Sequence, residues 1–398
     1  FKLDNGVWIN IIIWRKPMEL QNVSRAHVET LDLLQSQNTS KARIESLDWL
    51  RGLTALSIML YHLTDWHIQS LQADHFLGRL GIYGVSLFFI LSGLSMAVVY
   101  NKYIRNIETS ITFLIRRIFR ILPLLFIVST IMFAFNIIRT NSFHTDYFIK
   151  YLLTISTLFG FIKPDAYTIT GAWSIGNEMV YYVLTPFIIA LYNYKRRLGN
   201  LIFAVSLFVA GCFAFRYLNS NQLIGEQWSI YVNPFNNLFF YLGGIAIFYN
   251  LKDVKFNKYL NVVMLVFAIS LFCLIPATGN QIVLVTSVLR ILFSVLCFVI
   301  VVGFYKFEFD LPKKIAYPLE IFGIATYGIY IFHPMVNTFL SLVLNKIGIA
   351  RFGLVGNVAI VFLVSLITTA VALVSFYKFE LKFMNFGKKI TKKIKLQH

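Results

Sequence analysis

The chain contains a series of apolar stretches that are each about as long as a bilayer is thick. Because a membrane-spanning helix needs about 20 predominantly apolar residues, these stretches predict an all-α polytopic membrane protein. They are eleven in number, at 48–66, 82–100, 118–138, 147–162, 174–193, 201–218, 234–250, 260–276, 282–304, 321–343 and 352–377. The stretch at 147–162 is the shortest and the weakest of the series.

Composition excludes the other fold classes. Of the 398 residues, 58% are hydrophobic and 14% are charged, against roughly half and a quarter in an average soluble domain. A soluble or disordered chain is therefore excluded, and a single membrane unit is expected. The three cysteines, Cys212, Cys273 and Cys297, all lie inside apolar runs, which excludes a disulfide framework and a cysteine-based metal site.

The distribution of Lys and Arg predicts the topology, because these residues collect in cytoplasmic loops. If 147–162 does not span, the segments on one side carry 24 Lys and Arg from Lys41 onward, and the other side carries seven. We therefore predict about ten transmembrane helices with both termini in the cytoplasm. The net charge of +18 follows from this topology, so no nucleic-acid partner is expected.

The two ends of the chain are set apart from the membrane unit. Residues 1–43 form an N-terminal extension, in which Met18 opens a polar stretch typical of a cytosolic N-terminus. We leave residues 1–17 out of fold reasoning, as sequence that need not be native, and we identify no cleavable signal peptide in them. Residues 44–385 form the membrane domain, and the Lys-rich residues 386–398 form a basic cytoplasmic tail, which we expect to lie on an anionic membrane surface.

Arg51 and His62 lie eleven residues apart in the first predicted helix. Eleven residues are about three helical turns, so both side chains share one stripe and lie about 16 Å apart along the axis. Arg51 falls near the cytoplasmic end and His62 deep in the outer half, which suits a long anionic donor whose reactive end enters the membrane. Charges within spans are often functional, but a snorkelling Arg and a hydrogen-bonded core His explain the pattern equally well.

A second basic feature, Arg117 and Arg120, precedes Pro123 at the same inner level as Arg51. Residues at i and i+3 share a helix face, and guanidinium groups match the geometry of phosphate. The pair therefore indicates an anion site at the cytoplasmic side. An ordinary positive-inside anchor is the simpler interpretation of each Arg taken alone.

Two further titratable residues fall inside predicted spans. Glu178 lies a few residues below the outer face, at a depth comparable to that of His62. Its carboxylate could orient the imidazole or raise its basicity, or it could pair with Arg290 in a structural role. His333 precedes Pro334, which breaks the helix ladder, so it is either a second catalytic group or it fills the backbone positions that the proline frees.

These residues resemble the acyltransferase 3 family of integral membrane acyltransferases, which O-acylate extracytoplasmic sugars. The resemblance covers about residues 44–385 and rests on motifs in the family's order and spacing. The matching positions are Arg51 and His62; Gly84 through Ser92 and Gly93; Arg117 and Arg120; Trp173, Ser174, Glu178 and Tyr182; Tyr327, Tyr330, His333 and Pro334; and Glu380. Two positions depart from the pattern, since Ser86 and Met179 stand where family members often have an acidic residue, and any role for those carboxylates is absent.

The resemblance implies an acyl-CoA-dependent O-acyltransferase in the inner (plasma) membrane of a bacterium. It would move an acyl group, most often acetyl, from the cytoplasm to a hydroxyl of an extracytoplasmic or lipid-linked sugar. Acyl-CoA would be a co-substrate, and no permanently bound cofactor or metal is implied. The implied roles are general base and second catalytic residue for His62 and Glu178, acyl-CoA binding for Arg51, Arg117 and Arg120, and support for Ser92, Trp173, Tyr182 and His333.

Other functions stay open at this point. A transporter or flippase for a glycan carrier fits ten spans with buried charges, although no internal repeat of the kind common in transporters is visible. A polytopic glycosyltransferase would need a catalytic carboxylate in an outer loop, and the longest such loop, 139–173, offers Asp146 and Asp165. The sequence separates neither direct transfer from an acyl-histidine relay nor one sugar from another. Aromatic residues that could stack on a sugar, or form the interfacial belt, are Trp66, Tyr83, Tyr167 and Trp228.

Overall fold

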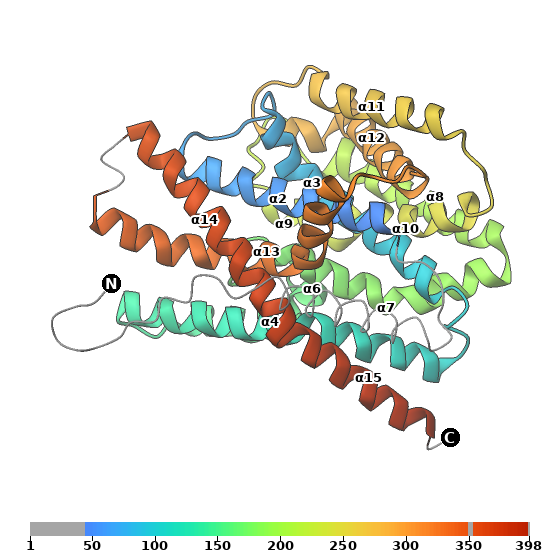
Figure 1. The fold of residues 1–398 in the computed structure, drawn as a ribbon, viewed down its shortest axis with the longest axis horizontal. Helices are drawn as coiled ribbons and strands as arrows, with labels where there is room; N and C mark the ends of the chain where they lie inside the picture. The colour runs from blue at the N-terminus through green and yellow to red at the C-terminus, as the bar shows by residue number, and fades with distance from the viewer. Residues whose placement is uncertain (1–43, 349–352, 397–398) are drawn as a thin grey trace. The chain divides into compact units, whose positions relative to one another are not determined.

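A computed structural model describes residues 44–348 and 353–396, and every regular element in these ranges is a helix (Figure 1). The predicted all-α class is confirmed for this part of the chain, whereas the extension 1–43, with residues 1–17, lies outside the described residues. The long helices are α2 (Glu45–His67), α3 (Phe76–Tyr100), α4 (Ile107–Thr140), α7 (Ala172–Tyr194), α8 (Arg196–Cys212), α10 (Pro234–Leu251), α11 (Lys258–Leu274), α12 (Ser287–Tyr305), α13 (Lys313–Lys346), α14 (Gly353–Ser375) and α15 (Leu381–Leu396). Shorter ones are α5 (Thr145–Ser156), α6 (Phe159–Ile162), α9 (Trp228–Tyr231), η1 (Phe213–Tyr217), η2 (Gln281–Val285) and η4 (Phe376–Glu380).

Seven helical segments are long and apolar enough to cross a membrane, which makes this a polytopic membrane protein. They are Phe76–Tyr100, Ile107–Thr140, Ala172–Tyr194, Arg196–Tyr217, Ser287–Tyr305, Lys313–Lys346 and Gly353–Lys392. The other three predicted spans also form helices, but α2 and α10 carry more polar residues and α11 is 17 residues long. The count of ten and the cytoplasmic position of the termini stay predictions.

The segment 147–162 is not one helix. It is divided between α5 and α6, with Thr157 between them in the left-handed region at φ 59°. Helix α2, which precedes this segment, and helix α13, which follows it, run parallel. His62 contacts His333, and His67, further along α2, contacts Asn337, further along α13. That direction agrees with a path in which 147–162 does not cross the membrane.

Close backbone approaches at glycines set the packing of α2 on α13 and of α3 on α10. A Cβ built on Gly52 would lie 2.7 Å from the backbone nitrogen of Gly323, and one built on Gly93 would lie 1.9 Å from the carbonyl oxygen of Tyr241. Helices in membranes associate through such small residues, because the backbones can then pack closely. Helix α3 lies at the centre of the bundle, against α2, α7, α10 and α12.

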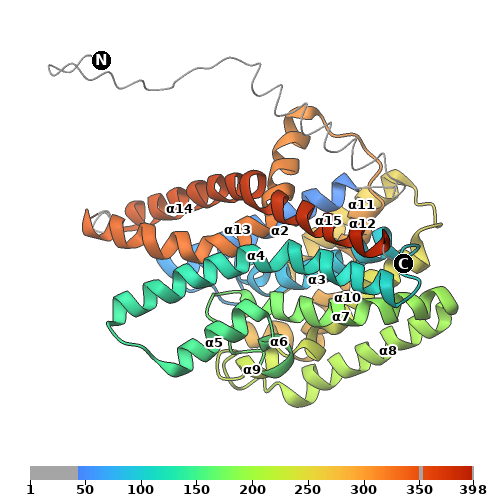
Figure 2. The same ribbon diagram turned by 90° about the horizontal axis from the view of Figure 1, so that it is seen from below.

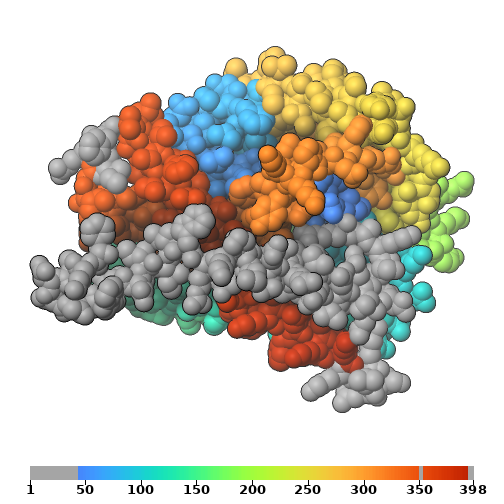
Figure 3. Space-filling model, viewed as in Figure 1, coloured from blue at the N-terminus to red at the C-terminus, as the bar shows by residue number. Residues whose placement is uncertain are grey.

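The outward faces of the peripheral helices are apolar. Large exposed side chains include Phe208 of α8, Phe267 of α11 and Phe362 of α14. The surface formed by α11 and by α14 is visible in the space-filling view (Figure 3). Exposed apolar bands of this kind are what a bilayer, rather than water, stabilises.

Helix α15 packs against the first half of α4 (Figures 1 and 2). Phe386 stacks edge-on against Phe119, and a Cβ built on Gly387 would lie 2.8 Å from the Phe119 Cβ. The helix begins at Leu381, so the predicted boundary between domain and tail at 385/386 falls inside a helix. Membrane-surface binding by this tail stays a prediction.

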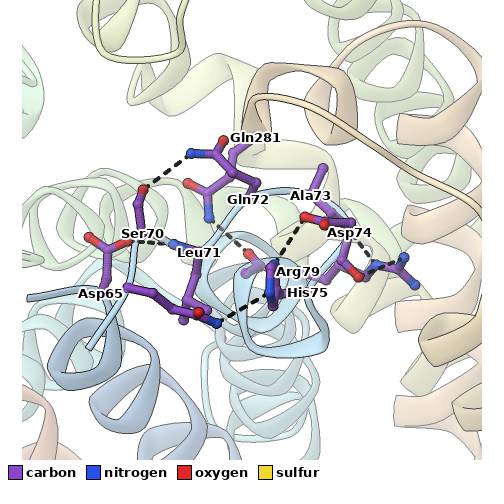
Figure 4. Close-up of polar contacts among 11 residues, drawn as sticks. Asp65, Ser70, Leu71, Gln72, Ala73, Asp74, His75, Arg79 and Gln281 are labelled. Atoms are coloured by element: carbon purple, nitrogen blue, oxygen red, sulfur yellow. Dashed lines mark hydrogen bonds and ion pairs between the residues drawn. The ribbon is translucent and has the colours of Figure 1, made fainter. Parts of the chain in front are cut away.

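The connection from α2 to α3 is held by a dense set of hydrogen bonds. Asp65 Oδ1 accepts from the Leu71 amide at 2.8 Å, and Arg79 donates to the carbonyls of Ala73 at 2.9 Å and Cys273 at 2.6 Å. Figure 4 shows Leu71 and Ala73 of this connection together with Asp65 of α2 and Arg79 of α3. The outer end of α2, which carries His62, is thereby fixed relative to α3 and α11.

We predict that Gly52→Ala destabilises the fold. The added Cβ would press on the backbone of Gly323, and a methyl group forced into a packed contact costs about 1–3 kcal/mol. Gly211→Ala in α8 is the matched control, because nothing lies within 4 Å of its Cβ position. Thermal unfolding in detergent should show a lower midpoint for Gly52→Ala alone, and equal midpoints would contradict the contact.

Candidate active site

A histidine pair, His62 and His333, joins α2 to α13 in the C-terminal half of each helix. The Nδ1 of His62 lies 3.0 Å from the Nε2 of His333, and the His62 ring stacks on Trp66 with 5.2 Å between centroids. His333 is fully buried, His62 is half-buried and Trp66 is 38% exposed. The pair therefore has one member inside the bundle, and its His62–Trp66 side is partly exposed.

The start of α7 is tied to α13 one turn from the histidine pair. Tyr330 Oη lies 2.8 Å from Ser174 Oγ and donates to the Gly171 carbonyl at 2.8 Å. Trp173 is buried next to this link and packs against Phe89 and Tyr231. Tyr330, whose ring also lies against His333, thus links α13 to the residues on either side of Trp173, and Trp173 itself points into the packed core.

Glu178 lies in a separate carboxylate network with Ser92 and Tyr182. Its Oε1 accepts from Ser92 Oγ at 2.6 Å and from the Tyr182 hydroxyl. No hydrogen bond joins Glu178 to His62 in the described part of the chain, and Phe88, one turn before Ser92, packs on Tyr330 between the two centres. The expectation that Glu178 lies level with His62 is wrong, because α7 presents it to the inner half of α3.

Arg290 does not pair with Glu178 either. Its guanidinium donates to the carbonyls of Val285 at 3.1 Å and Asn236 at 2.7 Å, and it lies over the Phe239 ring. These contacts satisfy a buried cation with backbone carbonyls rather than with a carboxylate. The structural role proposed for Glu178 as a partner of Arg290 is therefore excluded.

Arg51 connects α2 to α3. It forms an ion pair with Asp48 at 2.6 Å and donates to the Leu91 carbonyl at 3.2 Å and to Ser95 Oγ. Leu91 and Ser95 flank Ser92 on α3, so Arg51 lies beside the carboxylate network and about three turns below His62. Most of its donors are already used by the protein.

Arg117 and Arg120 turn toward different neighbours, although they share a helix face in sequence. Arg117 donates to Tyr100 Oη at 2.9 Å and lies over the ring of Tyr182, which belongs to the carboxylate network. Arg120 contacts the sulfur of Met384 at 3.1 Å and interacts electrostatically with Glu380. The predicted arginine pair is therefore separated, and Arg117 alone adjoins the other candidate residues.

The aromatic residues singled out near the outer face differ in their availability. Tyr83 is buried and donates to the Leu284 carbonyl at 2.5 Å, so it cannot stack on a sugar. Trp228 donates to Tyr167 Oη at 2.7 Å. Burial raises the pKa of Tyr167 to about 12, so this phenol is neutral at ordinary pH. Trp66 is the aromatic residue that lies directly on the histidine pair.

Comparison with known proteins identifies the family. The model of the acyltransferase domain of the acyltransferase 3 family matches residues 44–377, most of the chain. This chain belongs to the acyltransferase 3 family. A protein of Acidianus two-tailed virus, ORF330, whose name describes it as a putative acetyltransferase, is 24% identical over 76% of this chain and 86% of its own length. Nodulation protein 10 of Rhizobium leguminosarum bv. viciae is 26% identical over 31% of this chain and 37% of its own length.

No solved structure gives a significant match to the chain. The family match and the helical bundle together make this protein a membrane acyltransferase. Within the described residues, no group of His, Cys, Asp and Glu is arranged to hold a metal ion.

Sequence reasoning missed several residues that contact the candidate site residues or lie beside them. Ser95 and Tyr100 of α3 bind Arg51 and Arg117, and Arg116 lies beside Tyr103. A serine one turn after the motif residue Ser92 was a usable signal for Ser95. Nothing in the sequence marks Tyr100, because its role depends on how α3 and α4 pack.

We predict that Glu178→Ala destabilises the protein and that Glu178→Gln does so much less. Removing the acceptor leaves the hydroxyls of Ser92 and Tyr182 without their shared partner, at a cost of about 1–3 kcal/mol. The glutamine amide oxygen can still accept from both. Thermal unfolding of the two variants in detergent measures the difference, and equal losses would show that the negative charge, not the hydrogen bonding, stabilises the network.

Proposed function

We propose that this acyltransferase moves an acyl group, most simply acetyl, from acyl-CoA on the cytoplasmic side to a hydroxyl of an extracytoplasmic or lipid-linked sugar. The observation that carries the proposal is the half-buried His62 imidazole, hydrogen-bonded to a second, buried histidine. The printed names of the relatives, an acetyltransferase and a nodulation protein, support acyl transfer and do not name this chain's substrates.

The hydrogen bonds around His333 indicate which nitrogen of His62 would act as the base. The Nδ1 of His333 lies 3.2 Å from the Ile329 carbonyl, which can only accept, so this nitrogen carries the proton. In neutral imidazole the other nitrogen is then an acceptor, and His333 Nε2 accepts a hydrogen bond from the N–H at His62 Nδ1. His62 Nε2 is left with a free lone pair. His333 is therefore a positioning residue. Pro334, which lacks an N–H, leaves the Tyr330 carbonyl without its helix donor, and the His333 ring interacts with that carbonyl as well.

The reaction balances with His62 as a proton carrier. Its Nε2 takes the proton from the acceptor hydroxyl while the oxygen attacks the thioester carbonyl carbon, which forms the new C–O bond. The C–S bond then breaks, and the imidazolium returns the proton to the leaving CoA thiolate. The products are the sugar ester and free CoA, and no other reactant is needed.

The donor and the acceptor approach the site from opposite sides in this proposal. Arg117 adjoins the carboxylate network and would bind a phosphate of acyl-CoA, whereas Arg51 and Arg120 already have protein partners and would mainly position the helices. Trp66, exposed beside His62, offers an aromatic face to a sugar. The proposal includes the inner membrane of a bacterium, and it includes cytoplasmic termini because the distribution of Lys and Arg favours them.

We predict that His62→Gln abolishes acyl transfer without weakening acyl-CoA binding. Loss of a general base lowers the rate by about 10²- to 10⁴-fold, and the donor's phosphates bind far from this residue. Arg117→Ala should instead raise KM for acyl-CoA. The measurement is CoA release and sugar acylation by purified protein in detergent, beside His67→Gln, a histidine on the same helix that binds Asn337 instead.

Full activity of the His62→Gln variant would exclude both direct transfer and an acyl-histidine relay. To separate the two pathways, the wild type is incubated with labelled acyl-CoA in the absence of sugar, and the reaction is then quenched. Direct transfer leaves the protein unlabelled. A labelled peptide containing His62 would establish the relay instead.

We predict that His333→Leu lowers kcat by about tenfold, because losing the acceptor removes one hydrogen bond that holds the His62 tautomer. His333→Gln should recover part of the rate, since its amide oxygen can accept from His62 Nδ1. Nitrogen-15 NMR of labelled histidine should show His62 protonated at Nδ1 in the wild type. A His62 protonated at Nε2 would contradict the assignment, whatever the activity.

A further inference from the structure

Two cations from different helices approach each other where α15 lies on α4. Arg116 Nε donates to Thr391 Oγ1 at 3.3 Å, and that hydroxyl in turn donates to the Lys388 carbonyl at 3.0 Å. The ammonium of Lys388 and the guanidinium of Arg116 repel each other electrostatically, and both side chains are half-buried. The packing of α15 on α4 therefore holds Lys388 close to Arg116, although the two positive charges repel each other.

The third cation of this cluster is Arg117. It donates to Tyr100 Oη at 2.9 Å, and the same phenol interacts with Arg116 and Lys388. Tyr103, next to Tyr100, lies under the Arg116 guanidinium with 5.4 Å to the ring centroid. Three cations from two helices thus surround one phenolic oxygen at the end of α3.

None of these three cations has a carboxylate partner among the described residues, whose ion pairs are Arg51–Asp48 and His75–Asp74. The Nε of Arg117 is also buried without a hydrogen-bond partner. Like charges held close together destabilise a fold unless an anion neutralises them, and guanidinium groups are suited to bind phosphate. Arg120 differs, because Glu380 lies within its electrostatic reach.

We propose that α15 completes a phosphate-binding site formed by Arg116, Arg117 and Lys388 around Tyr100, and that this site takes the phosphate-bearing nucleotide end of acyl-CoA. This assignment of the ligand rests on the proposed function. Helix α15 begins at Leu381, beyond the residues 44–377 that match the family model, so the site draws on an element outside that domain.

The position of the site favours a nucleotide over a lipid headgroup, which has the same phosphate chemistry. Arg117 lies over Tyr182, which binds Glu178 and through it Ser92, so polar groups continue from the cations into the bundle. To react at His62, a donor bound there would extend its thioester past this network and past Phe88. A lipid phosphate would need only the surface side of Arg116 and Lys388.

The test measures binding of CoA to purified full-length protein by calorimetry, for the wild type, Lys388→Gln and Lys389→Gln. Lys389 is the matched control, since it is adjacent on the same helix and exposed. A charged hydrogen bond lost at Lys388 should weaken CoA binding about tenfold, and Lys389→Gln should bind CoA as the wild type does. Each protein is also titrated with nanodiscs of phosphatidylglycerol in phosphatidylcholine and with pure phosphatidylcholine nanodiscs.

The outcomes separate the site from the proposed function. CoA binding that is equal in the wild type and in Lys388→Gln, in protein of unchanged melting temperature, would overturn the site and leave acyl transfer intact. Binding of phosphatidylglycerol that depends on Lys388, with no binding of CoA to the wild type, would overturn the nucleotide assignment and also the acyl-CoA donor. Arg116→Gln serves as a second variant and should weaken CoA binding in the same direction.

Discussion

The backbone contact between Gly52 and Gly323 fixes the register on which the candidate chemistry depends. The two glycines face each other on parallel helices, and His62 and His333 each follow ten residues later. Both helices rise about 1.5 Å per residue, so residues at equal distances from the contact arrive at the same level. A helix pair without this close approach would have no reason to bring its histidines within hydrogen-bond distance.

Polar groups in an apolar bundle must be satisfied by one another, because the surroundings offer no water. Three buried groups have particular partners: Glu178 accepts from two hydroxyls, Arg290 binds backbone carbonyls, and Arg51 is held by Asp48 and α3. Satisfied in this way, such groups contribute to the stability of the fold. His62 and the cations around Tyr100 are different, since each retains a donor or an acceptor that the protein does not use.

The sequence predicted the helices well, because the length of an apolar run is a local property. It also singled out Arg51, His62, Glu178 and His333 as candidates, through spacing and through the family's motifs, and their roles stay predictions. It could not predict that Glu178 binds Ser92 rather than approaching His62, or that Arg117 and Arg120 turn apart. Those outcomes depend on the register between α3, α4 and α7, which are far apart in sequence, and no periodicity within one helix encodes that register.

The separation between the cation cluster and His62 has a consequence for the reaction. Tyr100 lies five residues, about 8 Å, beyond Ser95 on α3, and Arg51, which binds Ser95, lies about 16 Å from His62 on the antiparallel α2. The two ends are therefore about 24 Å apart along the bundle, most of the roughly 30 Å of a hydrocarbon core. A donor held by its phosphates at one end can react at the other only through an extended arm. Because the phosphates and the acyl group then bind to different helices, changes near Tyr100 should alter donor affinity, and changes near His62 should alter the rate of transfer.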